Sequence, residues 1–173
     1  MEDTPSPGRN KFDPALTEER LARLVRLAAR AFNRSLQIRL QPEGVTFGQW
    51  IFLRILWYDD GLSQRELSQR AHLTEPTAHS ALTKLEKQGI ITRRKPDGNK
   101  RTLQVFLTPK GWALRDRLEP MARDLNERSL QGLNDEDERI LRKGLLAIIR
   151  NLEEDEEEAA RQGIKMPATR PTL

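Results

Sequence analysis

Cysteine is absent from the 173-residue sequence, and histidine occurs only twice, at His72 and His79. The lack of cysteine excludes disulfide bonds, zinc–thiolate sites and thiol nucleophiles. A metal site is not indicated, because no cluster of carboxylates lies near either histidine in the sequence. A glycine-rich phosphate loop and a nucleophile elbow are also missing. We therefore expect a protein that is not an enzyme and that binds no cofactor or metal.

Long apolar runs are missing as well. The longest apolar clusters, Trp50–Leu53 and Leu145–Ile149, are far shorter than the roughly 20 residues that a membrane-spanning helix needs. The first residues, Met1–Pro5, lack the basic and then apolar layout of a signal peptide. These features predict a cytoplasmic protein.

Charge is abundant but unevenly distributed. Charged residues make up 32% of the sequence and the formal net charge is +4. The segment 63–110 alone holds ten Lys and Arg against four Asp and Glu, a balance of +6, so the rest of the chain carries −2. A basic block in an otherwise acidic chain is typical of a segment that meets phosphates. A membrane surface could attract the same charge, but the block contains no long basic amphipathic helix.

Two helices are predicted ahead of the basic block. Apolar residues recur at helical spacing over 17–40, and Thr17 is expected to cap this first helix. Thr46 and Gln49 form a capping-box pattern at the start of a second helix over 46–58. This second helix is apolar on nearly all sides, so we expect it in the middle of a helical bundle.

The basic block itself predicts two helices and a hairpin. Ser63 starts a second capping box and a short helix, and Thr74 caps the next helix, which ends near Gly89. Strands are expected over 90–95 and 102–107, with a basic turn between them.

Two longer helices are predicted after the hairpin. Thr108 and Pro109 begin the first, and Asn134 begins the second. Beyond the second, the acidic run Glu153–Glu158 is expected to be solvated. Both helices carry apolar stripes that we expect to face inward. In the final helix the stripe consists of Ile140, Leu141, Leu145, Ile148, Ile149 and Leu152.

Four short motifs follow one another through the central region of the sequence. The motifs are SQRELSQRA at Ser63–Ala71, LTEPT at Leu73–Thr77, LTKLEKQGIITR at Leu82–Arg93 and VFLTPKG at Val105–Gly111. Each motif is weak alone, but their order and spacing together are specific, and they resemble the MarR family of bacterial regulators. The resemblance covers roughly 46–112 by motif, and about 17–152 by the type and placement of the helices. The implied fold is mainly α with a small β-wing, a winged helix-turn-helix.

A short helix and a second helix after a tight turn can place the second in the major groove of DNA, which supports the resemblance independently. Ser and Thr hydroxyls and His can bond to base edges or phosphates, and Lys to phosphates. Glu75 could accept a hydrogen bond from a cytosine amine, or could serve only as a partner of the helix dipole. The candidate DNA-binding residues of this region are Ser63, Gln64, Thr74, Glu75, Thr77, His79, Ser80, Thr83 and Lys84.

The resemblance implies that a basic residue at the tip of the hairpin enters the minor groove. In the family an Asp commonly precedes a pair of arginines there, whereas here Asn99 and Lys100 precede Arg101. Arg101 is the better match. A merely solvated hairpin is the alternative, but a row of like charges on two short strands is destabilising unless something neutralises it. The candidates on the hairpin are Arg93, Arg94, Lys95, Asn99, Lys100 and Arg101.

The resemblance also implies a homodimer built from the first and the last two helices. Their apolar stripes exceed the needs of one small lobe, although packing within one chain is the alternative. A dimer would place two recognition helices on half-sites about one DNA turn apart. The expected organisation is a flexible arm over 1–16, one domain over 17–158 and a tail over 159–173. Within the domain, 46–108 forms the DNA-binding lobe, and 17–45 with 109–158 forms the dimerisation lobe.

Members of the family often bind small aromatic or phenolic acids between these two lobes. An aromatic wall with an arginine would suit a planar carboxylate. The alternative is that Trp50 and Trp57, seven residues apart on one helix face, belong to the core. The candidate ligand-binding residues are Arg26, Arg30, Trp50, Arg54 and Trp57.

The sequence therefore predicts a dimeric, sequence-specific DNA-binding regulator, most often a repressor, released from a near-palindromic operator by a small aromatic or phenolic ligand. A non-specific architectural DNA-binding protein is one alternative, although the varied polar face of the helix after Thr74 favours base recognition. A protein–protein adaptor on a winged-helix scaffold is the other, and the basic block argues against it.

Overall fold

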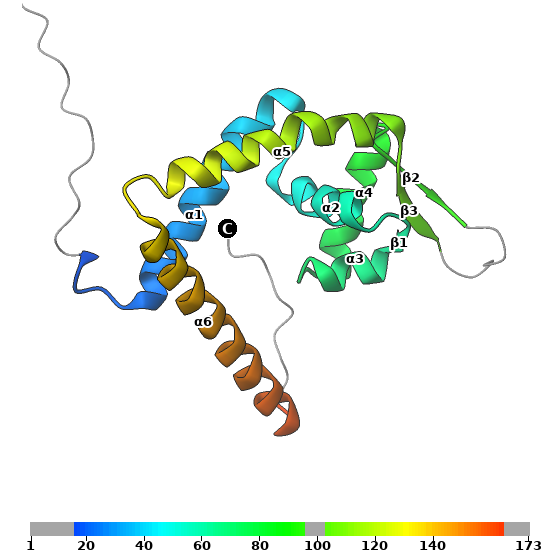
Figure 1. Cartoon of the computed structure of the whole chain (residues 1–173). Helices are drawn as coiled ribbons and strands as arrows, with labels where there is room; N and C mark the ends of the chain where they lie inside the picture. The colour runs from blue at the N-terminus through cyan, green and yellow to red at the C-terminus, as the bar shows by residue number, and fades with distance from the viewer. Residues whose placement is uncertain (1–15, 96–102, 165–173) are drawn as a thin grey trace, which may run out of the picture.

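The protein forms an arch of two lobes joined by one long helix (Figure 1). The computed structural model describes residues 16–95 and 103–164. A compact lobe of short helices and a small sheet forms one end of the arch, and at the other end the first and last helices cross in this view. The helices are α1 (Leu21–Leu40), α2 (Phe47–Tyr58), α3 (Gln64–Arg70), α4 (Glu75–Lys87), α5 (Pro109–Ser129) and α6 (Asp135–Arg161), with a 3-10 turn, η2, at Gln41–Glu43. The strands are β1 (Leu62–Ser63), β2 (Ile91–Arg94) and β3 (Gln104–Leu107).

Most helices begin where the sequence predicts a cap. Thr46 and Ser63 each form a complete capping box, with Gln49 and Glu66 as the reciprocal partners. Thr74 and Thr108 accept hydrogen bonds from the third backbone amide of α4 and α5, and each helix has a proline in its first turn. These caps satisfy backbone N–H groups that would otherwise lack partners.

The start of α1 differs from the prediction. Thr17 does not cap the helix, because α1 begins at Leu21 and Arg20 occupies the N-cap position with an extended backbone. No side chain caps this end, and the first turn holds no acidic residue. Glu19 instead forms an ion pair with Arg23, four residues later. The local preference for a cap at Thr17 is therefore outweighed by a turn over 16–20.

The sheet has three strands in the order β1-β3-β2, all antiparallel. The hairpin strands are shorter than predicted, and β1 was not predicted because two residues give no detectable periodicity. Leu62 pairs with Val105, which joins the start of α3 directly to the hairpin. The predicted basic turn, including Asn99, Lys100 and Arg101, lies outside the described residues.

The core centres on α2, as its all-round apolar character predicts. Phe52, Leu53 and Leu56 are completely buried. The indole N–H of Trp57 donates a 3.0 Å hydrogen bond to the carbonyl oxygen of Gly111. Gly111 lets α5 approach the sheet closely, because a Cβ there would collide with the carbonyl oxygen of Ile90. These contacts fix α5 against the compact lobe.

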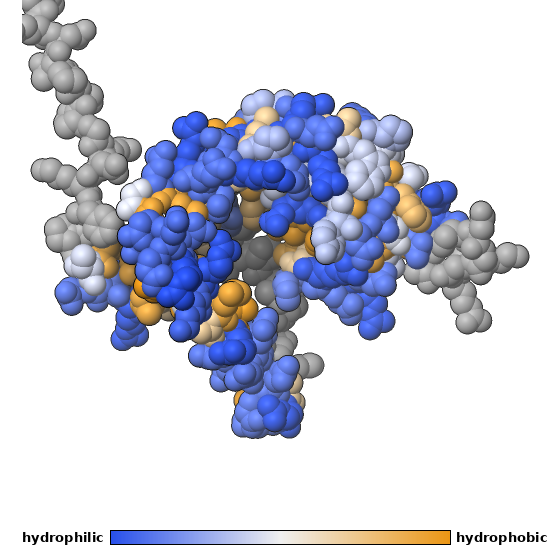
Figure 2. All heavy atoms as spheres, in the orientation of Figure 1, coloured by the Kyte–Doolittle hydropathy of each residue, from blue (hydrophilic) through white to orange (hydrophobic). Residues whose placement is uncertain are grey.

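The final helix has no buried residue, so the prediction that its apolar stripe faces inward is wrong for the single chain. Leu141, Ile149 and Leu152 are each about half exposed. Apolar side chains appear on α6 and beside α1 in Figure 2. The acidic run Glu153–Glu158 is exposed as expected, but it is helical, and α6 continues to Arg161. Within the described residues, no helix combines the length and apolar character needed to cross a bilayer.

Candidate nucleic-acid interface

Helices α3 and α4 form a helix-turn-helix unit held by a shared apolar interior. Leu67 of α3 and Leu82 and Ala78 of α4 are completely buried. The turn between the helices passes through His72, whose φ of 51° lies in the left-handed region. Histidine is one of the side chains that tolerate this backbone better than most. His72 is therefore part of the turn between the two helices.

The face of α4 that points away from the core carries the predicted contact residues. Its inner face buries Ala78, Leu82 and Leu85. The outer face thus presents a carboxylate, an imidazole, hydroxyls and an ammonium group within a helix of 13 residues. Glu75, His79, Ser80 and Lys84 are exposed, and Thr77 and Thr83 are half-buried.

Some of these polar groups already have partners within the protein. The hydroxyl of Thr74 accepts a hydrogen bond from the Thr77 amide at 3.4 Å, and the two threonine hydroxyls lie 2.8 Å apart. His79 Nδ1 lies 3.2 Å from the side-chain oxygen of Gln64 on α3. Thr74 and Thr77 therefore stabilise the start of the helix, whatever else they contact.

Ser63 has a similar structural task at the start of α3. Its hydroxyl donates to a carboxylate oxygen of Glu66 at 2.7 Å and accepts from the Glu66 amide at 3.2 Å. The hydrogen bond from the Ser63 hydroxyl to the carboxylate, together with one from the backbone amide of Ser63, lowers the pKa of Glu66 below its ordinary value. Ser63 thus fixes the helix that carries Gln64.

The N-terminal ends of α3 and α4 border a surface hollow of about 760 Å³ beside strand β3. Glu75 lies on this hollow, in the first turn of α4, where both roles considered for it are geometrically possible. Arg65 and Gln69 of α3 also line it, although the sequence prediction did not include them. Their polar side chains on the short helix after the Ser63 capping box were the sequence feature that could have identified them.

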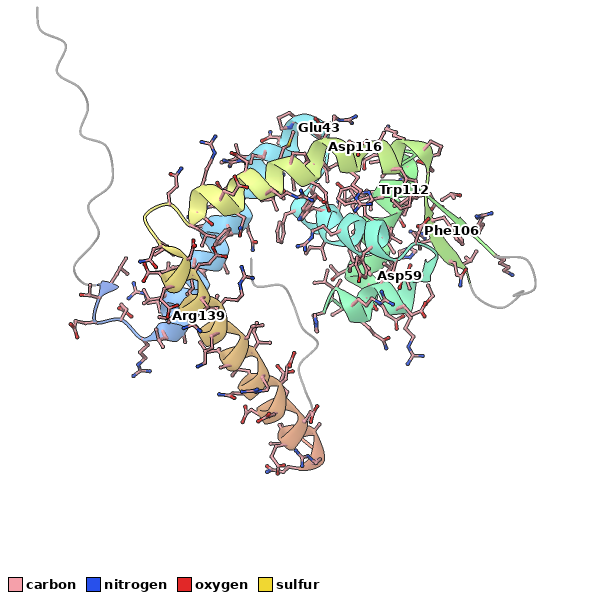
Figure 3. The ribbon with its side chains drawn as sticks, in the orientation of Figure 1. Glu43, Asp59, Phe106, Trp112, Asp116 and Arg139 are labelled. Atoms are coloured by element: carbon pink, nitrogen blue, oxygen red, sulfur yellow. The ribbon has the colours of Figure 1, made fainter. Side chains whose placement is uncertain are left out.

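The two arginines at the end of β2 point to opposite faces of the sheet. Arg94 is exposed, and its guanidinium carbon lies 4.2 Å from the ring centre of Phe106, which Figure 3 labels on β3. Arg93 points toward α4 and is half-buried. Lys95, just beyond the strand, is exposed. Arg94, stacked on Phe106, and Lys95 are therefore exposed to a ligand, whereas the side chain of Arg93 is directed at α4.

The candidate ligand residues of α2 lie at the junction of the two lobes. Trp50 and Trp57 are each only 4% exposed and meet edge to face, with ring centres 5.5 Å apart. They are thus core residues, as the alternative interpretation predicted, with only their edges at the surface. The exposed guanidinium of Arg54 lies 6.0 Å from the ring centre of Trp50.

Two adjoining hollows, of about 470 and 660 Å³, share a wall at this junction. Arg26 is exposed on α1, and Arg30 borders a separate hollow with Gln37 and Phe47. Of the five candidate ligand-binding residues, Trp50 and Arg54 therefore line both hollows and Trp57 lines the larger one, whereas Arg26 and Arg30 line neither. Residues lining both hollows are Asn33 and Leu36 of α1, Trp50 and Arg54 of α2 and Glu119 of α5.

This combination of a capped helix-turn-helix and a β-hairpin defines a winged-helix protein of the DNA-binding class. The model of the MarR family matches residues 45–103. A curated relative, the HTH-type transcriptional repressor Rv2887 of Mycobacterium tuberculosis, is 35% identical over 54% of this chain and 68% of its own length. The HTH-type transcriptional regulator TtmR of Methylorubrum extorquens is 32% identical over 62% of this chain, but the match spans just over half of its length, 55%.

Solved structures agree with this assignment. Rv2887 in complex with salicylic acid superposes with a TM-score of 0.62 and 28% identity, covering 77% of this chain and 98% of that one. A MarR family regulator from Listeria monocytogenes, complexed with a 26mer DNA, has a TM-score of 0.74 at 24% identity, covering 86% and 99%. At that identity the Listeria structure supports the fold. The chain belongs to the MarR family of transcriptional regulators.

Proposed function

We propose that the protein is a sequence-specific DNA-binding repressor that places α4 in the major groove. The observation that carries this proposal is the outer face of α4, where Glu75, His79, Ser80 and Lys84 are exposed opposite a fully buried inner face. Such a varied set of donors and acceptors suits base edges, whereas a uniformly basic face would suit phosphates alone. Gln64 and the exposed basic residues Arg94 and Lys95 extend the same surface.

The working unit in this proposal is a homodimer. Leu21 and Ile38 of α1 are each 68% exposed, and Ile149 and Leu152 of α6 are 52% and 58% exposed. Large contiguous apolar surfaces are rare on monomers and mark association sites. A two-fold pairing through α1, α5 and α6 would bring two copies of α4 to half-sites about one helical turn apart on a near-palindromic operator. Residues 46–108 then serve as the DNA-binding lobe, and 17–45 with 109–158 as the dimerisation lobe.

The proposed effector is a small aromatic acid bound at the junction of α1, α2 and α5. The exposed guanidinium of Arg54 beside Trp50 could hold a carboxylate next to an aromatic surface. The relative Rv2887 has been crystallised with an acid of this kind. A ligand there would release DNA only if it binds better to a dimer whose two α4 helices are wrongly spaced.

Footprinting of the purified protein on DNA flanking its own gene tests the DNA-binding proposal. With excess competitor DNA present, we expect protection of one short site with two-fold symmetry. Smeared protection that the competitor erases would instead indicate an architectural protein, and no binding at low salt would indicate an adaptor.

Salicylate is the probe for the proposed effector site. We expect it to release DNA from the wild-type protein, and we expect Arg54→Gln to need roughly tenfold more salicylate because a charge-assisted hydrogen bond is lost. Arg34→Gln serves as the matched control, since Arg34 is exposed on α1 and borders a different hollow. If Arg54→Gln and Arg34→Gln bind salicylate with equal affinity in calorimetric titration, Arg54 does not belong to the effector site.

A further inference from the structure

Arg93 and Arg94 are neighbours in the basic hairpin, yet they lie in different environments. Arg93 pairs with Val105 in the β2–β3 ladder, and Arg94 pairs with Gln104. Because side chains alternate across a strand, Arg93 shares the face of buried Ile91, while Arg94 lies on the opposite face with Phe106. The first arginine is therefore directed toward the recognition helix α4.

The side chain of Arg93 is held by two residues of α4. Its Nη2 donates a 2.9 Å hydrogen bond to the hydroxyl of Thr83. Its Nε lies 3.6 Å from a carboxylate oxygen of Glu86, and the other oxygen of Glu86 accepts the backbone N–H of Arg93 at 3.2 Å. Glu86 thus contacts both the main chain and the side chain of the same residue.

The burial of the Arg93 side chain makes the arrangement costly to break. This side chain is only 16% exposed, and its Nε is buried without a hydrogen-bond partner, 3.6 Å from the half-exposed carboxylate of Glu86. If Arg93 turned outward to a phosphate, the hydroxyl of Thr83 would lose its donor. Glu86 would keep the backbone N–H of Arg93 but lose the guanidinium that offsets its negative charge close to the DNA.

We infer that Arg93 is a positioning residue that clamps the hairpin to the recognition helix through Thr83 and Glu86, and that it does not contact a DNA phosphate. This inference rests on the proposed function. Thr83 lies one turn beyond Ser80 and His79 on α4, so the clamp ties the base-contacting face to the strand that carries Arg94 and Lys95. Its role is to present the major-groove helix and the hairpin at one fixed separation, which determines how well a particular DNA site fits both.

Three variants test the clamp by competition binding at several salt concentrations. Arg93→Lys keeps the charge but loses the planar fork of donors. The double variant Arg93→Met with Glu86→Gln removes the clamp while leaving the net charge unchanged. Arg94→Met is the matched control, because the neighbouring arginine is exposed and free to reach a phosphate.

We expect both Arg93 variants to bind the protected site roughly tenfold more weakly, a typical coupling for contacting residues, with the salt dependence of the wild type. Arg94→Met should instead flatten the slope of log K against log salt by about 1.8, the value for two phosphates, because each chain of the proposed dimer loses one contact. Full affinity in Arg93→Lys, or a flatter slope in the charge-neutral double variant, would overturn the inference. Thermal unfolding followed by circular dichroism checks that each variant is folded.

A second measurement needs no DNA. In the free protein, the side-chain N–H resonances of Arg93 should shift in Thr83→Val and in Glu86→Gln, and unchanged resonances in both would overturn the clamp. The two proposals can also fail separately. If the resonances shift but the wild-type protein shows no preference for any DNA site, the clamp is supported and the proposed sequence-specific function is wrong.

Discussion

The two lobes of the arch solve the problem of burying apolar surface in different ways. The winged-helix lobe, residues 46–108, buries the hydrophobic faces of α2, α3, α4 and the sheet against one another. Its helices α2 and α3 begin with complete capping boxes. Each local signal in this lobe therefore finds its partner within the same chain, which is the consistency expected of a self-sufficient fold.

The helical lobe, formed by α1, α6 and the adjoining part of α5, lacks this closure. The 27-residue helix α6 contributes no residue to the core, and along α1 only Leu36 and Leu40 are buried. A strong cap at Asn134 and a regular apolar stripe show that α6 is nonetheless well specified as a helix. Helical periodicity therefore identifies the face of a helix that becomes buried, but it does not determine whether the same chain or a second molecule covers that face.

The largest expected effect comes from breaking the apolar face of the helical lobe. Ile149→Asp places a carboxylate where we expect a second copy to pack, and burying an unpaired charge should weaken dimerisation by about 3 kcal/mol or more. We expect light scattering to show a monomer at micromolar concentration, together with loss of site-specific DNA binding.

Lys143→Glu is the matched control for this variant. Lys143 is exposed on α6 and lies two residues from Leu145, on the other side of the helix. It should leave the dimer intact. A dimer that survives Ile149→Asp would show that the face is not covered by a second copy.

A smaller effect is expected inside the winged-helix lobe, where α5 is attached to α2. Trp57→Phe removes a buried hydrogen bond to Gly111 and leaves a small void, at a cost of about 2 kcal/mol in the free energy of unfolding. Trp112→Phe is the control, because Trp112 is 41% exposed and should change stability by less than about 0.5 kcal/mol. Urea denaturation measures both, and equal costs would contradict the anchoring role of Trp57.

The smallest effect concerns a cap and depends on pH. Ser63→Ala should cost about 1 kcal/mol at neutral pH, because α3 loses its N-cap. In the wild type the hydrogen bonds from Ser63 lower the pKa of Glu66 from 4.5, so this carboxylate stabilises the fold above that value and less as pH falls through the lowered pKa.

The stability difference between wild type and Ser63→Ala should therefore narrow below pH 4.5 in thermal unfolding. Ser129→Ala, at the exposed end of α5, is the control and should show no such pH dependence. A difference that widened in acid would contradict the assignment.

Local signals in the sequence predicted much of the fold. The capping boxes at Thr46 and Ser63 are confirmed, as is the central position of α2. The predicted start of α1 at Thr17 was wrong, because a capping preference of about 1 kcal/mol is easily outweighed by the path of the preceding chain. Strand β1 could not be found, since two residues carry no period and their pairing with β3 is a long-range contact.

The sequence predicted which residues of the candidate DNA-binding surface are exposed on α4, but not the hydrogen bonds that join them to other elements. Residues facing outward on α4 follow from helical periodicity, whereas the hydrogen bond from Arg93 to Thr83 joins two elements. Strand alternation counted from Ile91 would have placed Arg93 on the inner face. The position of Asn33 of α1 on the junction hollows was not predictable, because their walls also include Glu119 of α5, which is distant in sequence.

Native mass spectrometry of the protein with one duplex that contains the protected site tests the central claim most directly. The account predicts two chains of 20.0 kDa bound to one duplex, because the helical lobe pairs the chains and each winged-helix lobe occupies one half-site. A complex of one chain with one duplex, at concentrations where the site is fully occupied, would contradict it.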